Sequence, residues 1–246
     1  MREVRFDHIA MATSRIADAQ TVLVGELGGT PHHAGSSGVY RFAQWRFEGG
    51  GRLEVLEPTR QEGFLQRFLV SRGAGVHHVT FRVPSLREAC DRAVARGYRI
   101  VGYDDADPGW SEAFLHPKEA LGIVVQLAES RRLPTGARPS RPPAPLAAGD
   151  SPRPVTILGL RTRARSRDRA SAQWGGILQG ESSERNGTLA YRWPRSPLRL
   201  TIEIDPAAEE GPICIEYWSE RPVNLPEGLH LVLGAVFARR EAPDAD

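Results

Sequence analysis

The chain has 246 residues, of which 40% are hydrophobic and 25% charged, a composition that is typical of globular proteins and excludes global disorder. The 32 basic and 30 acidic residues nearly cancel, to a net charge of +2, so we expect neither nucleic acid nor a membrane surface as a partner. Two cysteines are too few for a disulfide scaffold or a thiolate zinc site. Since the sequence shows no signal-peptide core and no apolar run of ~18 residues, we expect a cytoplasmic protein.

The first 129 residues are predicted to contain two copies of one motif, offset by about 70 residues. In the first copy, around residues 5–58, a strand-like segment at 6–13 leads into a helix that begins near Ser14 and stops at Gly28. Strands are expected at 39–47 and 52–56, where apolar residues are dense.

The second copy, around residues 75–129, repeats this order. Its strand at 76–83 precedes a helix with Ser85 as N-cap and Glu88 three residues later, a pattern typical of a capping box. Further strands are expected at 99–101, 112–115 and 123–127. Each copy is therefore predicted as a strand, a helix and three strands (βαβββ), which makes residues 1–129 one α+β domain of two modules.

A proline-rich segment separates this domain from the rest of the chain. Residues 130–154 hold seven of the 19 prolines, a density that prevents helix or sheet and predicts an extended linker. Residues 155–246 resemble a degenerate third copy, with strands at 156–161, 188–193 and 198–204 and a helix-like segment at 166–178. A further strand start at 211–217 indicates a partial fourth copy.

Four polar residues occupy equivalent strand positions in the two copies. His8 corresponds to His78, and Glu54 corresponds to Gln126. Each lies in an otherwise apolar strand, where a polar side chain that faces inward needs a partner. Two imidazoles and two side-chain oxygens suit a divalent metal ion such as Zn, Co, Ni, Mn or Fe. We therefore predict a metal site at which the two copies meet.

Four segments in order carry a resemblance to a known family: FDHIAMAT, RLEVLEP, GAGVHHVTFRV and FLHPKEALGIVVQLAE. The sequence resembles the vicinal oxygen chelate (VOC) superfamily, which includes glyoxalase I, methylmalonyl-CoA epimerase and ring-cleaving dioxygenases, and it is most similar to the epimerases over residues 5–129. The resemblance implies paired βαβββ modules forming a curved sheet around a metal. It places the four metal ligands on His8, Glu54, His78 and Gln126.

The sequence departs from the epimerase pattern at two places. The epimerases normally have Glu where this chain has Gln126, and they place an acid/base Glu in the loop that here reads AGSSG at residues 34–38. Candidate replacements for the acid/base are Asp107 and Glu112 in the second copy, and Glu54 itself.

By this resemblance, we expect a metal-dependent isomerase that stabilises an enolate next to a carbonyl, most like an epimerase of a methylmalonyl-CoA-type thioester. A glyoxalase I-like lyase, a metal-free VOC protein that binds a small molecule, and a ring-cleaving dioxygenase are the alternatives. The substrate is expected to be a small molecule. A homodimer is plausible, although the C-terminal half could instead cover the same surface within one chain.

The remaining histidines and cysteines are expected to be structural. His77 should face away from His78 because neighbouring residues alternate along a strand. His32 and His33 are predicted in a surface loop, and His116 in a turn. Cys90 and Cys214 are predicted to lie in the core.

Overall fold

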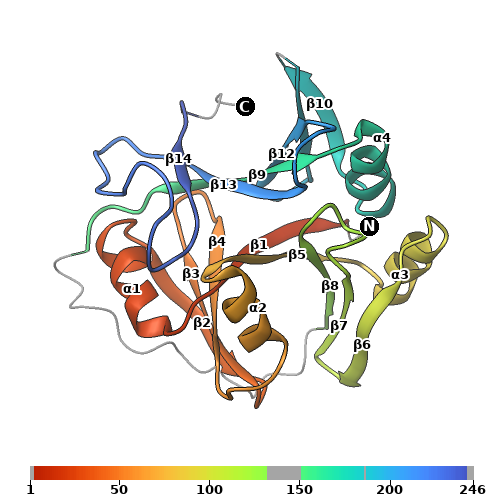
Figure 1. Ribbon diagram of the computed structural model, residues 1–246, viewed down its shortest axis with the longest axis horizontal. Coiled ribbons are helices and arrows are strands. Elements are labelled where there is room, and N and C mark those ends of the chain that lie inside the picture. The colour runs from red at the N-terminus through yellow and green to blue at the C-terminus, as the bar shows by residue number, and fades with distance from the viewer. Residues whose placement is uncertain (1–2, 132–150, 186, 243–246) are drawn as a thin grey trace. The chain divides into compact units, whose positions relative to one another are not determined.

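A computed structural model describes residues 3–131, 151–185 and 187–242 (Figure 1). Most of the predicted linker, residues 132–150, lies outside the described residues. No helix among the described residues is both long and apolar enough to cross a membrane.

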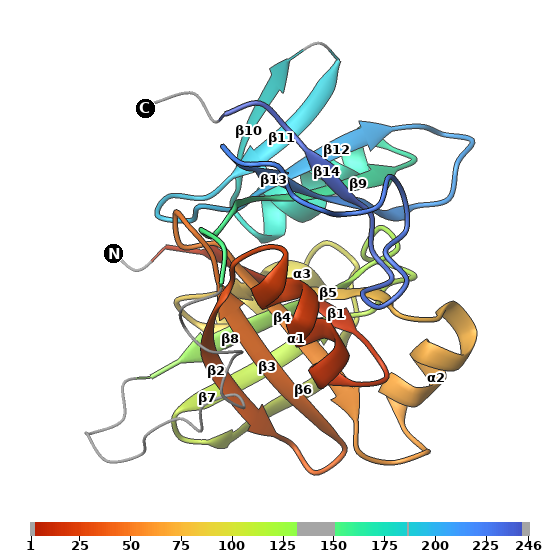
Figure 2. The ribbon, with the colours of Figure 1, turned by 90° about the vertical axis from the view of Figure 1, so that its left-hand side faces the viewer.

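The first module has the predicted βαβββ order, but its strand β2 lies where the sequence analysis placed no strand. Its elements are β1 (Arg5–Ala12), α1 (Ile16–Gly25), β2 (Thr30–Ser36), β3 (Tyr40–Arg46) and β4 (Arg52–Pro58). The strands lie in the order β2-β3-β4-β1, with β1 parallel to β4 and the other pairs antiparallel (Figure 2). The expectation that His32 and His33 lie in a loop was wrong, because both belong to β2. The Pro and Gly residues around them masked an edge strand, where Pro is tolerated.

A helix that the sequence analysis did not predict follows the first module. Helix α2 (Phe64–Arg72) begins after Gly63 and ends before Gly73, two glycines that both have positive φ. It places Leu65 in a cluster with Ala10, Ala12 and Leu56 of the module's sheet. Only this one residue of α2 is buried, so the helix lacks the broad apolar stripe that reveals a helix in a sequence.

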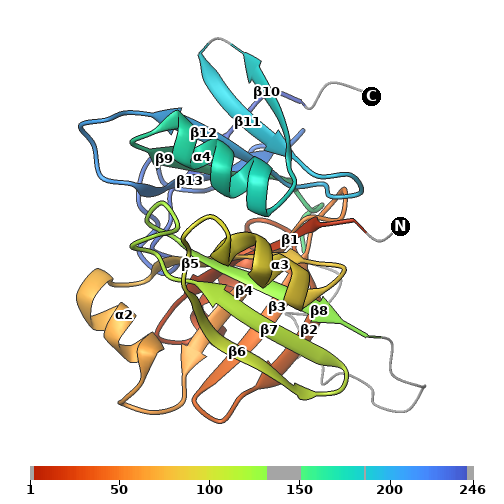
Figure 3. The same ribbon diagram turned by 90° about the vertical axis from the view of Figure 1, so that its right-hand side faces the viewer.

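The second module has the predicted order of elements. It consists of β5 (Gly75–Arg82), α3 (Leu86–Val94), β6 (Ile100–Asp107), β7 (Trp110–Leu115) and β8 (Val124–Ser130). The strands lie in the order β5-β8-β7-β6, and α3 packs on one face of them (Figure 3). The Ser85 hydroxyl accepts a hydrogen bond from the Glu88 N–H at 3.3 Å, which confirms the predicted N-cap.

In both modules a glutamate of the closing strand caps the N-terminus of the helix. The carboxylate of Glu57, near the end of β4, accepts the first N–H of α1, at Ile16, over 2.8 Å. Glu129, near the end of β8, accepts the first N–H of α3, at Leu86, over 2.9 Å. A carboxylate at a helix N-terminus satisfies an otherwise orphan donor and interacts favourably with the helix dipole. Each closing strand is thereby tied to the helix of its own module.

The C-terminal region forms a complete third module and a partial fourth. The third comprises β9 (Thr156–Ala164), α4 (Arg167–Ala170) continued by a π-helix (Ser171–Ile177), β10 (Glu181–Arg185), β11 (Thr188–Arg192) and β12 (Arg199–Ile204). Strands β13 (Gly211–Trp218) and β14 (Phe237–Arg239) follow, with no helix between them in the part of the chain that the structure describes. The α+β prediction of paired βαβββ modules, a third copy and a partial fourth is confirmed. Strand β10, whose residues are all exposed, was missed.

The chain divides into two compact units, each of which joins an N-terminal module to C-terminal strands. The first unit contains the described residues among 1–8, 78–136 and 159–213, and in its core the rings of Phe6 and Phe81 stack while Trp193 packs edge-on against both. The second contains those among 9–77, 137–158 and 214–246. The division into a domain at 1–129 and another at 155–246 stays a prediction.

Candidate metal centre

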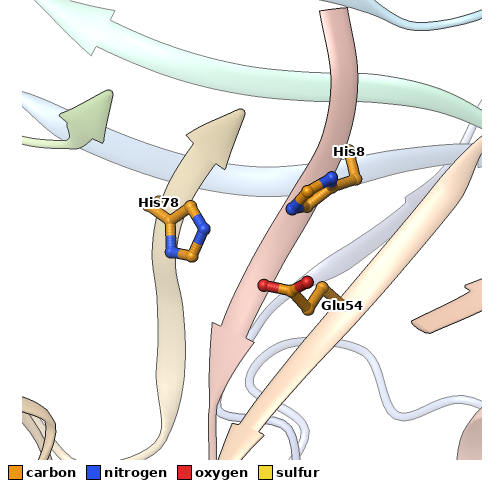
Figure 4. A group of neighbouring side chains, drawn as sticks. All are labelled: His8, Glu54 and His78. Atoms are coloured by element: carbon orange, nitrogen blue, oxygen red, sulfur yellow. The ribbon is translucent and has the colours of Figure 1, made fainter. Parts of the chain in front are cut away.

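Three of the four predicted metal ligands lie together. His8 on β1, Glu54 on β4 and His78 on β5 each offer one ligand atom, and these atoms all lie within 4.8 Å of one another (Figure 4). All three side chains are buried. Strand pairing explains the position of Glu54, because its backbone neighbour across the β1–β4 ladder is Ala10, two residues after His8.

A buried carboxylate orients the first imidazole. Asp7 Oδ2 lies 2.9 Å from His8 Nδ1, and the Asp7 side chain is fully excluded from solvent. Arg5 and Arg82 flank the same carboxylate at 3.2 and 3.5 Å, which offsets the cost of burying its charge. Because Nδ1 faces the Asp7 carboxylate, Nε2 is the His8 nitrogen that would bind a metal.

The fourth predicted ligand, Gln126, approaches His8 through a hydroxyl group. Thr80 Oγ1 lies 2.9 Å from His8 Nε2 and donates a hydrogen bond to Gln126 Oε1 at 2.5 Å. The amide oxygen that would bind a metal is therefore engaged by Thr80 in this structure. Thr80 is completely buried, so the three side chains form a desolvated polar cluster.

Each module contains a Gln–Glu pair on neighbouring strands, with the two residue types exchanged. In the first module Gln44 of β3 donates to Glu54 of β4 at 2.7 Å. In the second module Gln126 of β8 donates to Glu112 of β7, also at 2.7 Å. The carboxylate thus lies on the closing strand in the first module and on the preceding strand in the second. This exchange explains how the chain carries Gln at the fourth ligand position while keeping a carboxylate beside it.

The structure separates the two candidate acids of the second module. Glu112 Oε2 accepts hydrogen bonds from Gln126 and from the Trp110 indole N–H, at 2.7 and 2.8 Å, whereas its Oε1 has no hydrogen-bond partner among the described residues. Asp107 lies exposed at the end of β6, where Oδ1 accepts the Gly109 N–H at 2.7 Å. Only Glu112 contacts a predicted ligand.

His77 lies apart from the three clustered ligands. Its ring packs against Phe64 and Phe68 of α2, with centroid distances of 5.6 and 4.9 Å. Burial lowers the pKa of His77 to about 4, and the charge of Glu54 opposes that shift only in part. His77 is therefore neutral, and its ring packs helix α2 against β5.

Sequence reasoning missed the residues that support the ligands. Asp7 directly precedes His8, and Thr80 lies two residues after His78 in the same predicted strand. Gln44 is a polar residue in an otherwise apolar strand. Each carries the same signal that selected the ligands, a polar residue where a core residue is expected. Which polar residues meet across strands depends on pairing, which the sequence did not reveal.

The donor set fits a divalent transition metal. Two imidazoles and one carboxylate, buried and within 4.8 Å of one another, form the ligand combination typical of Zn or of non-haem iron sites. A carboxylate behind one imidazole is the usual outer-shell partner of a ligating histidine. Three strands of the first two βαβββ modules bring this donor set together.

Part of the chain matches a known family. Residues 7–114, less than half of the chain, match the model of the Glyoxalase/Bleomycin resistance protein/Dioxygenase superfamily. The chain is 28% identical over 133 residues to YqjC, an uncharacterized protein of Bacillus subtilis, covering 52% of this chain and 93% of YqjC.

Two further matches extend the comparison. The chain is 30% identical over 82 residues to an ethylmalonyl-CoA/methylmalonyl-CoA epimerase of Cereibacter sphaeroides, which covers 32% of this chain and 61% of the epimerase. A mutant of 4-hydroxymandelate synthase from Streptomyces coelicolor matches 90% of this chain and 72% of its own, with a TM-score of 0.59 and 15% identity. The second match shows that the fold similarity extends across the C-terminal modules.

Proposed function

We propose that the protein is a metal-dependent enzyme that moves a proton at a carbon next to a carbonyl, most like an epimerase of a methylmalonyl-CoA-type thioester. The observation that carries this proposal is the buried His8, Glu54 and His78 group, whose ligand atoms lie within 4.8 Å of one another. The partial similarity to an ethylmalonyl-CoA/methylmalonyl-CoA epimerase supports the choice of substrate class.

In this proposal His8, Glu54 and His78 hold the metal, with Gln126 as a fourth ligand. A bound divalent metal would supply a Lewis acid that stabilises the negative charge developing on the substrate's carbonyl oxygen. Gln126 would offer its amide oxygen, which accepts from Thr80 in this structure, and its amide nitrogen donates to Glu112. Because these side chains are buried, their attraction for a cation is stronger than it would be in water.

Glu112 is the side chain best placed to take or return the proton. Two N–H donors fix its Oε2, so the carboxylate has a defined orientation and its Oε1 remains available. Epimerisation by two groups needs a second acid, and Glu54 is the candidate, because the Asp7 carboxylate is already engaged by His8, Arg5 and Arg82. Asp107, exposed and bound within its own turn, is a weaker candidate.

Deuterium exchange at the α-carbon of methylmalonyl-CoA, measured after loading the protein with Zn, Co, Ni, Mn or Fe in turn, tests the proposal. We expect metal-dependent exchange that Glu112→Gln lowers by at least 100-fold, because the variant keeps the side-chain shape but removes the base. Glu62→Gln, a change at an exposed bend residue, is the matched control. Exchange that fails with every metal, in protein shown to bind that metal, would rule the proposal out.

A metal-free binding protein is the second candidate. The bond between Thr80 and Gln126 Oε1 favours it, because that bond satisfies the fourth ligand without a metal. Metal analysis after dialysis against divalent ions separates the two candidates. Less than half an equivalent of metal per chain would favour binding without catalysis.

A further inference from the structure

The first unit carries a pocket of about 510 Å³ that the proposed function does not use. Its walls include the side chains of Arg5, Arg82, Arg195, Ser130 and Glu3. Arg5 begins β1 and Arg82 ends β5, whereas Arg195 comes from the loop before β12. Three segments far apart in the sequence thus each bring one guanidinium group to the same hollow.

Arg195 occupies a strained position in a tight turn. The Ser196 N–H donates to the Trp193 carbonyl at 3.1 Å, which places Pro194 second and Arg195 third in the turn. Arg195 has a φ of 60°, a conformation normally taken by Gly or Asn at such a position. An arginine that bears this cost is a candidate for a role other than stability.

A hydrogen bond fixes this turn against the strand that supplies Arg5. The Ser196 hydroxyl donates to the Phe6 carbonyl at 2.6 Å and also accepts the Leu198 N–H. The Arg195 guanidinium is exposed and makes no ion pair or hydrogen bond with any described residue. The turn therefore holds an unneutralised cation at the pocket.

The other two arginines are partly neutralised but firmly placed. Both contact the buried Asp7, and Arg82 stacks on the Trp110 ring at 4.2 Å from its centroid. Their side chains are 46% and 24% exposed, so both remain accessible to an anion. The pocket is lined by three arginines and by one carboxylate residue, Glu3, and the buried Asp7 contacts two of these arginines, so the arginines outnumber the carboxylates.

A second basic hollow, in the other unit, shows what a neutralised site looks like. It is lined in part by His32, Arg46, Glu48 and Arg153. There Arg153 bridges Glu48 and Glu220 at 2.9 and 2.6 Å, so its charge is already satisfied. Arg195 has no such carboxylate among the described residues.

We propose that the pocket lined by Arg5, Arg82 and Arg195 binds a phosphate group. Guanidinium groups bind phosphate oxygens through paired N–H donors, and Ser130 adds a hydroxyl donor at the same wall. The phosphate is either free or part of a larger ligand such as a nucleotide-bearing thioester. The proposal does not depend on the metal-dependent reaction.

Calorimetric titration of the full chain with inorganic phosphate, after removal of metal by a chelator and at low ionic strength, tests this site. We expect saturable binding at one site per chain, weakened by added NaCl. Arg195→Gly should weaken it at least tenfold. Glycine accepts the positive φ without strain, so this variant should unfold at the same or a higher temperature than the wild type.

Arg60→Gly, at an exposed bend outside the pocket, is the matched control and should bind phosphate as the wild type does. Equal weakening by both variants, or no saturable binding, would overturn the proposal. Competition with coenzyme A identifies the source of the phosphate. Displacement that Arg195→Gly abolishes indicates a nucleotide-bearing ligand, and no displacement indicates a free phosphate.

Discussion

The first and second modules share a backbone plan but distribute their polar groups differently. Both place a histidine on the opening strand and tie the closing strand to the helix through a glutamate, Glu57 or Glu129. The residue before the histidine is Asp7 in one module and His77 in the other. Asp7 holds the His8 imidazole, whereas His77 packs on α2.

This difference shows that the two modules kept the residues that fix the backbone more strictly than the residues around the candidate metal centre. The groups that fix the backbone are the same in both modules, since each helix needs its first N–H satisfied. The groups around the candidate metal centre are exchanged, as the Gln44–Glu54 and Gln126–Glu112 pairs show. The two halves therefore contribute unequal charges to one site.

The largest expected effect comes from the carboxylate of the first module. Glu54→Gln should reduce zinc affinity by 100-fold or more, about 2.7 kcal/mol, because it removes the only anionic ligand of the proposed set. Competition with a chromophoric chelator measures the affinity. Glu62→Gln should leave it unchanged, and a similar affinity for both variants would mean that Glu54 is not a ligand.

The next effect comes from the residue before each histidine. Asp7→Asn should weaken zinc binding by about 10- to 100-fold, because the carboxylate behind a ligating imidazole raises its basicity. His77→Phe, the change at the counterpart position, should leave zinc affinity unaltered, since His77 is neutral and lies among aromatic rings. NMR of the His8 ring nitrogens would report any change of tautomer.

Reversing the second Gln–Glu pair should affect stability. Gln126→Glu brings two carboxylates together and is expected to cost about 1–3 kcal/mol of unfolding free energy in the metal-free protein at neutral pH. The repulsion raises the folded-state pKa of one carboxyl above its unfolded value, so the lost stability should return as the pH falls below that raised pKa.

The double variant Glu112→Gln with Gln126→Glu restores one carboxylate and one amide, in the arrangement of the first module. Urea unfolding should show most of the stability recovered. Additive losses in the double variant would contradict the direct Gln–Glu interaction.

The smallest expected effect concerns the helix N-caps. Ser85→Ala should destabilise the protein by about 1 kcal/mol, because Ser85 caps α3. Arg15, at the corresponding position of α1, makes no side-chain cap, so Arg15→Ser should stabilise by about 0.5–1 kcal/mol. Thermal unfolding checks both, and a loss of stability in Arg15→Ser would show that the two helix starts are not equivalent.

The sequence by itself predicted the module plan and three residues that the structure brings together, His8, Glu54 and His78. His8 and His78 occupy equivalent strand positions in the two copies, as do Glu54 and Gln126. Equivalent positions in two paired modules lie close together, so the alignment of the copies predicted which side chains meet. Capping at Ser85 was also readable, because it depends on residues only three apart. These features are either local in the sequence or repeated along it, so they can be recognised without knowing which strands pair.

Only the tertiary structure decided which side chains act together. Strand β2 was not predicted because it is held by pairing at the edge of the sheet. Helix α2 was not predicted because it is held by a single buried leucine, Leu65, and has no repeated apolar pattern. Asp7, Thr80 and Glu112 joined the candidate centre through contacts across strands, and the register of strand pairing selects those contacts. The proposed phosphate pocket likewise depends on the turn that holds Arg195, which the Ser196 hydroxyl ties to the Phe6 carbonyl of β1.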